Sequence, residues 1–131
     1  MTRLGARRHW LALVVLFGAG TATAGDVSFE NDVLPLLTVR CVMCHMDGAD
    51  QAHLSLYPDA WSHLVGIPST QSPLKRVEAA LPDKSYLYLK LMGTHLDAGG
   101  SGLRMPVQQD ALGADELTLI RTWIAQGALQ N

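Results

Sequence analysis

Two cysteines and a histidine stand together in the segment Cys41-Val42-Met43-Cys44-His45. In a C-x-x-C-H arrangement, each thiol can add across one vinyl group of a haem, and the adjacent imidazole can supply an axial ligand to the iron. We therefore predict one covalently bound haem c. Cys41 and Cys44 are its predicted thioether links, and His45 is the predicted proximal ligand of the iron.

Three other interpretations of this segment are a redox dithiol, a structural disulfide and half of a zinc site. A thioredoxin-like dithiol would need a βαβ pattern around the motif, and the surrounding sequence has none. A zinc site would need further cysteines or paired histidines, but the chain contains only two cysteines. The motif therefore favours covalent haem.

A haem bound at His45 leaves one axial position of the iron to be filled. The thioether and imidazole groups that follow in the chain are Met46, His53, His63, Met92, His95 and Met105. Met105 ends a glycine-rich segment, and Pro106 restricts its backbone, so we predict Met105 as the distal ligand with His95 as the alternative. Methionine opposite histidine stabilises ferrous iron and leaves no open site for oxygen chemistry.

The N-terminus has the three parts of a secretory signal. Arginines precede an apolar stretch at residues 10–20, and Ala22-Thr23-Ala24 provides a small-residue cleavage pattern. We predict a signal peptide over residues 1–24, cleaved after Ala24, and a periplasmic domain of residues 25–131. The apolar stretch is short for a membrane span, so no stable span is expected.

The predicted mature domain is acidic. Cleavage would remove three of the ten basic residues and none of the twelve acidic ones, leaving a formal net charge of −5. This charge argues against nucleic acid as a partner and favours redox protein partners with a basic docking patch. Because a single small domain has a marginal core, we expect a bound porphyrin to supply much of its apolar centre.

The mature sequence predicts short helices separated by loops, without convincing strands. Ser28 can cap a first helix that runs toward Cys41 and is kinked, shortened or restarted at Pro35. A second short helix is expected over residues 59–65, and a third, capped by Asp83 or Ser85, should end at Gly93. Residues 95–105 are glycine-rich and predict a flexible loop.

The last helix is the clearest. Acidic residues follow Ala114 in its first turn, and Gly127 is a plausible stop. An apolar stripe at helical spacing consists of Leu117, Ile120, Trp123 and Ile124. We expect this stripe to pack against the first helix, which carries Phe29 and Val33.

These segments resemble the small class I c-type cytochromes of bacteria, which are monohaem domains. The resemblance rests on residues 29–37, 40–45, 82–87, 104–106 and 116–128, and thus on most of the predicted mature chain. It implies an all-α, small cytochrome c-like fold of short helices and loops around one covalently bound haem. It also implies that the terminal helices cross near one haem edge and that Met105 is the distal ligand. The chain departs from the family at Met46, where a glycine is common.

The predicted function is that of a periplasmic monohaem c-type cytochrome that transfers single electrons between redox partners. The sequence contains no catalytic acid–base constellation, so enzyme activity is not expected. One alternative is a haem-bearing subunit of a larger periplasmic dehydrogenase or reductase. Another is a haem peroxidase or gas-binding protein with a displaceable distal ligand.

Overall fold

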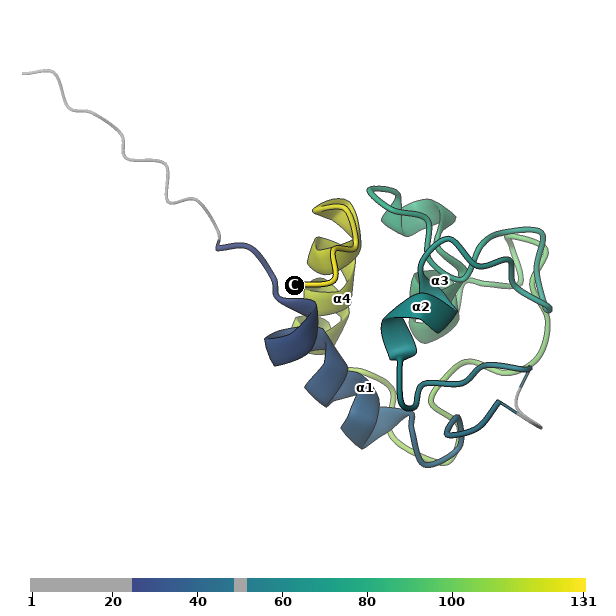
Figure 1. Ribbon diagram of the computed structural model, residues 1–131. Coiled ribbons are helices and arrows are strands. Elements are labelled where there is room, and N and C mark those ends of the chain that lie inside the picture. Colours follow the sequence, from purple (N-terminus) through teal and green to yellow (C-terminus); the bar gives the residue numbers. More distant parts are fainter. Residues whose placement is uncertain (1–24, 49–51) are drawn as a thin grey trace, which may run out of the picture.

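A computed structural model describes residues 25–48 and 52–131. The predicted signal peptide, residues 1–24, therefore lies outside the described residues. Figure 1 shows the arrangement of the helical elements in this part of the chain. In chain order they are the π-helical turn η1 (Phe29–Val33), α1 (Leu34–Arg40), α2 (Ala60–Leu64), the 3-10 turn η2 (Pro82–Lys84), α3 (Tyr86–Met92) and α4 (Ala114–Ala125).

The prediction of an all-α, cytochrome c-like fold is wrong. Only 38% of the described residues are helical. The described part of the chain contains no strand. Irregular segments separate the helices at residues 41–48, 52–59, 65–81 and 93–113. Residues 65–81 contain two prolines and several small polar residues, and residues 93–113 contain five glycines, which disfavour regular helices. Isolated β-bridges join Val65 to Val77, Pro68 to Lys75, and Lys75 to Ser85. The architecture is therefore a mixture of short helices and long, hydrogen-bonded loops.

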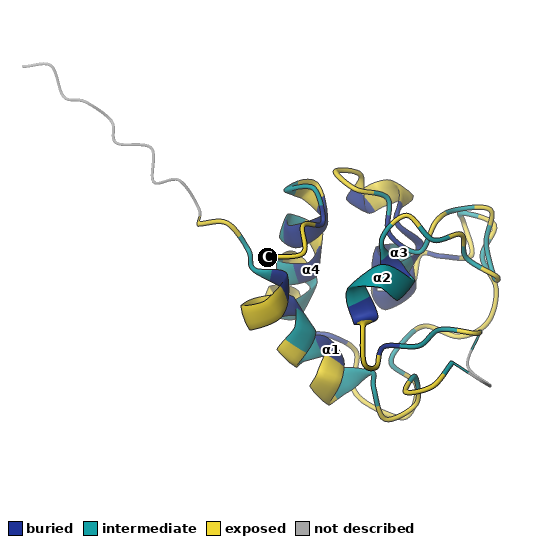
Figure 2. Ribbon diagram, in the orientation of Figure 1, coloured by how far each residue is buried: buried dark blue, intermediate teal, exposed yellow. Residues whose placement is uncertain are grey.

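The two ends of the described chain pack together, as the sequence predicts. Ser28 caps η1 by accepting a hydrogen bond from the Asn31 amide, and α1 restarts at Leu34 with Pro35 in its first turn. The ring of Phe29 lies 5.3 Å from that of Trp123 on α4, centroid to centroid. Figure 2 shows buried residues on the interior sides of these helices and exposed residues on the outer side of α1. This packing fixes α1, and with it the position of Cys41 at its end.

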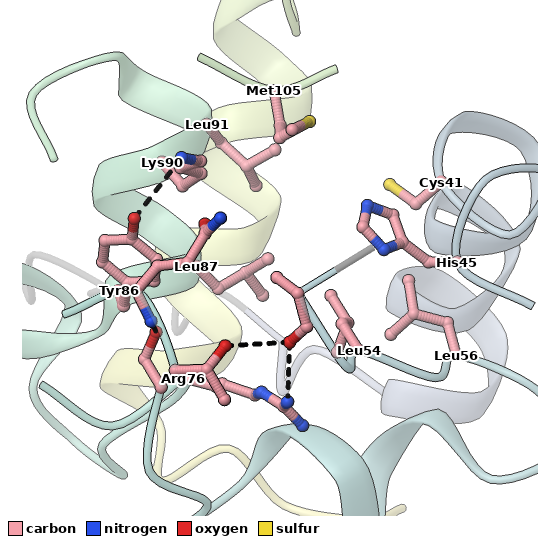
Figure 3. A pocket seen from close by; sticks show the side chains of 14 residues that line it. Cys41, His45, Leu54, Leu56, Arg76, Tyr86, Leu87, Lys90, Leu91 and Met105 are labelled. Atoms are coloured by element: carbon pink, nitrogen blue, oxygen red, sulfur yellow. Dashed lines mark hydrogen bonds between the residues drawn. The ribbon is translucent and has the colours of Figure 1, made fainter. Parts of the chain in front are cut away.

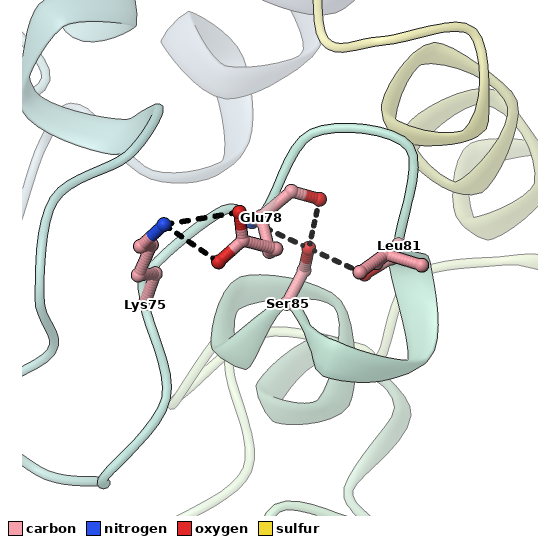
Figure 4. Close-up of polar contacts among 4 residues, drawn as sticks. All are labelled: Lys75, Glu78, Leu81 and Ser85. Atoms are coloured by element: carbon pink, nitrogen blue, oxygen red, sulfur yellow. Dashed lines mark hydrogen bonds and ion pairs between the residues drawn. The ribbon is translucent and has the colours of Figure 1, made fainter.

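Helix α3 begins and ends where the sequence predicts, but the side chain of Ser85 does not cap it. The fully buried Ser85 hydroxyl instead accepts a hydrogen bond from the Glu78 amide at 2.9 Å and lies 2.9 Å from the Leu81 carbonyl oxygen. Glu78 also forms an ion pair with Lys75 at 2.8 Å. Figure 4 shows these contacts closing the turn that precedes α3. At the other end, Gly93 adopts φ +84°, a conformation that ends the helix at no steric cost.

We expect Ser85→Ala to lower the free energy of unfolding by about 1 kcal/mol, because it removes the fully buried hydroxyl that bonds the Glu78 amide and the Leu81 carbonyl. Chemical denaturation of the purified protein measures this loss. Thr118→Ala, which removes an exposed hydroxyl from α4, is the control and should change the free energy by no more than about 0.5 kcal/mol. Equal stability of both variants would contradict a structural role for the Ser85 hydroxyl.

In residues 25–48 and 52–131, no helix has both the length and the apolar character needed to cross a membrane.

Candidate haem-binding site

The cysteine–histidine motif forms a tight turn directly after α1. The Cys41 amide donates to the Leu37 carbonyl at 2.9 Å, and the His45 amide donates to the Cys41 carbonyl at 3.1 Å. Because residues four apart in such a turn lie on one side, Cys41 and His45 border the same space. Cys41 is half-buried, whereas Cys44 is exposed, and the two thiols are not joined in a disulfide.

A largely apolar cavity lies beside this turn. It contains about 760 Å³ of empty space, a figure that includes space open to solvent. Cys41 and His45 border it on one side, and Met105 borders it from a distant part of the sequence. Its apolar walls are the side chains of Leu54, Leu56, Leu87 and Leu91. In Figure 3 the His45 ring points into the cavity, and the sulfur of Met105 is directed toward the side on which Cys41 and His45 lie.

A second hollow adjoins the same residues. It is bordered by Cys41, Cys44, His45 and Met105, together with Arg40 and residues 106–109. The four predicted site residues therefore surround one region of the molecule, although Met105 is far from the motif in sequence. Haem binding by these residues stays a prediction, but the structure brings both thiols, the imidazole and the thioether together.

The alternative distal ligand, His95, lies elsewhere. Its side chain is buried, and its Nε2 lies 2.9 Å from the Gly102 carbonyl oxygen. It borders neither hollow, and neither do the other histidine and methionine candidates, Met46, His53, His63 and Met92. Among the candidates raised by the sequence, Met105 alone is placed to face the same space as His45.

The environment of Cys41 is unlike that of a redox-active thiol. Burial raises the pKa of the Cys41 thiol to about 11, and the nearby Arg40 only partly offsets this effect. A reactive dithiol requires a thiolate stabilised at neutral pH. The half-buried position of Cys41 at the wall of an apolar cavity therefore does not favour a redox dithiol at this motif.

Two cationic residues of the cavity wall, Arg76 and Lys90, were not predicted from the sequence. The Arg76 guanidinium donates to the backbone carbonyls of His63 and His53, each at 2.8 Å, and burial lowers its pKa. Neither cation forms an ion pair with a carboxylate in the described residues. Lys90 could have been found from its position, since it lies four residues after Tyr86, on a helix face that is otherwise buried.

The residues present fit a haem. Thiol, imidazole and thioether groups are the protein groups that attach and ligate haem c, and the apolar walls suit a porphyrin. The described residues contain no group of three or more His, Cys, Asp or Glu side chains arranged to hold a metal ion by themselves. No protein-family model, curated protein or solved structure matches the chain. The motif at residues 41–45 and the geometry of the cavity are the features of this chain that bear on its function.

Proposed function

We propose that this protein is an exported monohaem c-type cytochrome that carries single electrons between redox partners. The observation that supports this proposal most strongly is that Cys41, Cys44, His45 and Met105 border one region, with Cys41, His45 and Met105 lining an apolar cavity. Export is supported by the signal-like residues 1–24, and it would bring the chain to the compartment in which thiols are joined to haem.

The bound haem would supply one-electron chemistry by alternating between ferric and ferrous iron. The protein's part would be to hold and tune it. Cys41 and Cys44 would bind it covalently, His45 and Met105 would ligate the iron, and the leucines of the wall would exclude water. Arg76 contributes a positive charge at the wall of the cavity that would offset the negative charge of the haem carboxylates.

The proposed partners are redox proteins with a basic docking patch. Residues 25–131 carry a formal net charge of −5, and the haem carboxylates would make the complex more acidic. Opposite charges on two partners accelerate their encounter, and salt screens this effect. Electron transfer to a basic acceptor should therefore slow as ionic strength rises.

Absorption spectra of the oxidised and reduced protein test the proposal, after expression with haem-attachment machinery. We expect low-spin iron in both states and no immediate change when imidazole or cyanide is added. High-spin ferric iron that binds these ligands at once would contradict the carrier function and favour a peroxidase or a gas-binding protein. Stoichiometric co-purification with a larger dehydrogenase or reductase would instead identify the chain as a subunit.

A further inference from the structure

Buried polar side chains hold the glycine-rich segment that leads to Met105, and two of them, Tyr86 and Lys90, come from α3. The Tyr86 hydroxyl donates to the Ser101 carbonyl at 3.1 Å, and the Lys90 ammonium donates to the same carbonyl. His95 Nε2 lies 2.9 Å from the Gly102 carbonyl, which only accepts hydrogen bonds, so Nε2 is the protonated nitrogen. We call Tyr86, Lys90 and His95 the loop clamp. Each is less than 9% exposed.

Backbone contacts extend this attachment to Met105 itself. The Met105 amide donates to the Lys90 carbonyl at 3.2 Å, and Arg104 Nε donates to the Leu91 carbonyl at 2.9 Å. Helix α3 therefore binds the segment through two side chains at Ser101 and through its carbonyl end at residues 104–105, whereas His95 bonds Gly102 from within the segment. The segment predicted to be a flexible loop is held at both places.

Two glycines allow this close approach. A Cβ at position 100 would lie 2.6 Å from the His95 carbonyl oxygen and 2.6 Å from Tyr86 Cε2, so only glycine fits there without displacing the loop. Gly102 adopts φ +75°, and a Cβ there would lie 3.2 Å from Lys90 Nζ. The sequence of the loop is thus matched to the side chains that hold it.

Lys90 is the member of the clamp that is hardest to explain by packing alone. It is 6% exposed and forms no ion pair in the described residues, so its charge is stabilised by the Ser101 carbonyl, the Tyr86 hydroxyl and the face of the Tyr86 ring, 5.5 Å away. Burial of a lysine without a carboxylate is costly unless its donors are satisfied. The geometry points to a positioning role: Lys90, with Tyr86 and His95, fixes the loop so that the Met105 thioether stays at the cavity.

This inference rests on the proposed function, in which Met105 binds haem iron. Lys90→Met keeps the length of the side chain but removes its donors. We expect imidazole to bind the ferric iron of this variant about tenfold faster than that of the wild type, because the loop releases the thioether more often. The rate is measured on protein whose covalent haem content has been determined. Tyr86→Phe should also speed imidazole binding. Lys90→Arg, which keeps a cationic donor at this position, should retain the slow binding of the wild type. Lys84→Met, which changes an exposed lysine of η2, is the control and should bind imidazole at the wild-type rate.

Hydrogen exchange measured by mass spectrometry on the same proteins provides a second measurement that does not depend on iron ligation. Peptides covering residues 99–105 should exchange faster in Lys90→Met and remain unchanged in Lys84→Met. Unchanged exchange or unchanged imidazole binding in Lys90→Met would overturn the inference. If the wild type binds imidazole as fast as Met105→Ala does, Met105 is not the distal ligand of the iron. The positioning role of Lys90 is then also wrong. Haem content tests covalent attachment separately from both.

Discussion

The double variant Cys41→Ala/Cys44→Ala is expected to contain no haem after denaturing electrophoresis. Both thiols border the site, and only covalent links survive the unfolding of the chain in detergent. Each single variant should retain haem through one remaining thioether, in a reduced yield. Haem staining of the gel, with the amount of protein determined on the same lanes, measures the effect.

Met43→Ala is the matched control, since Met43 stands between the two cysteines but is 87% exposed. It should retain haem at the wild-type level. The haem-free double variant should also show little fixed tertiary structure by near-ultraviolet circular dichroism, because the cavity that a porphyrin would fill is walled by residues packed against the core. A haem band that persists in the double variant would refute covalent attachment at this motif.

Met105→Ala is expected to lower the reduction potential and to convert the ferric iron to high spin or recruit another ligand. A thioether stabilises ferrous iron, and its loss opens the distal position. Axial ligands set haem potentials over a range of about 0.8 V, so a decrease on the order of 0.1 V is expected. Spectroelectrochemical titration measures the potential, and the absorption spectrum reports the spin state.

The matched control for this experiment is Met92→Ala. Met92 is 38% exposed at the end of α3 and borders neither hollow, so its removal should leave the potential and the spectrum unchanged. If Met105→Ala also leaves the spectrum unchanged, Met105 is not the ligand. In that case His95, which is buried and directed at the Gly102 carbonyl in this structure, would have to be tested next.

The terminal elements could be predicted from sequence because their signals are local. Ser28 accepts from an amide three residues later, and the stripe on α4 repeats at helical spacing, so neither depends on distant parts of the chain. The prediction of an all-α fold failed for the opposite reason. The paths of residues 52–59, 65–81 and 93–113 are set by contacts between distant segments, such as the bonds from Arg76 to the carbonyls of His53 and His63.

The candidate site divides in the same way. The motif at residues 41–45 is contiguous, so its chemistry follows from residue type and spacing. Met105 is predicted as the distal ligand from its glycine-rich loop, from Pro106 and from a family resemblance. In the structure Met105 borders the cavity together with Cys41 and His45. Lys90 could be singled out by its spacing from Tyr86. The partners of Arg76 and Lys90 could not be predicted, because each binds backbone carbonyls of segments that only the folded chain brings close.

In the proposed function, one haem is bound covalently through Cys41 and Cys44. Intact mass spectrometry of the denatured protein, expressed with haem-attachment machinery, tests this claim most directly. We predict a mass equal to the processed chain plus one haem, with no free thiol left to alkylate. The mass of the chain alone, with two thiols that react with an alkylating agent, would contradict it.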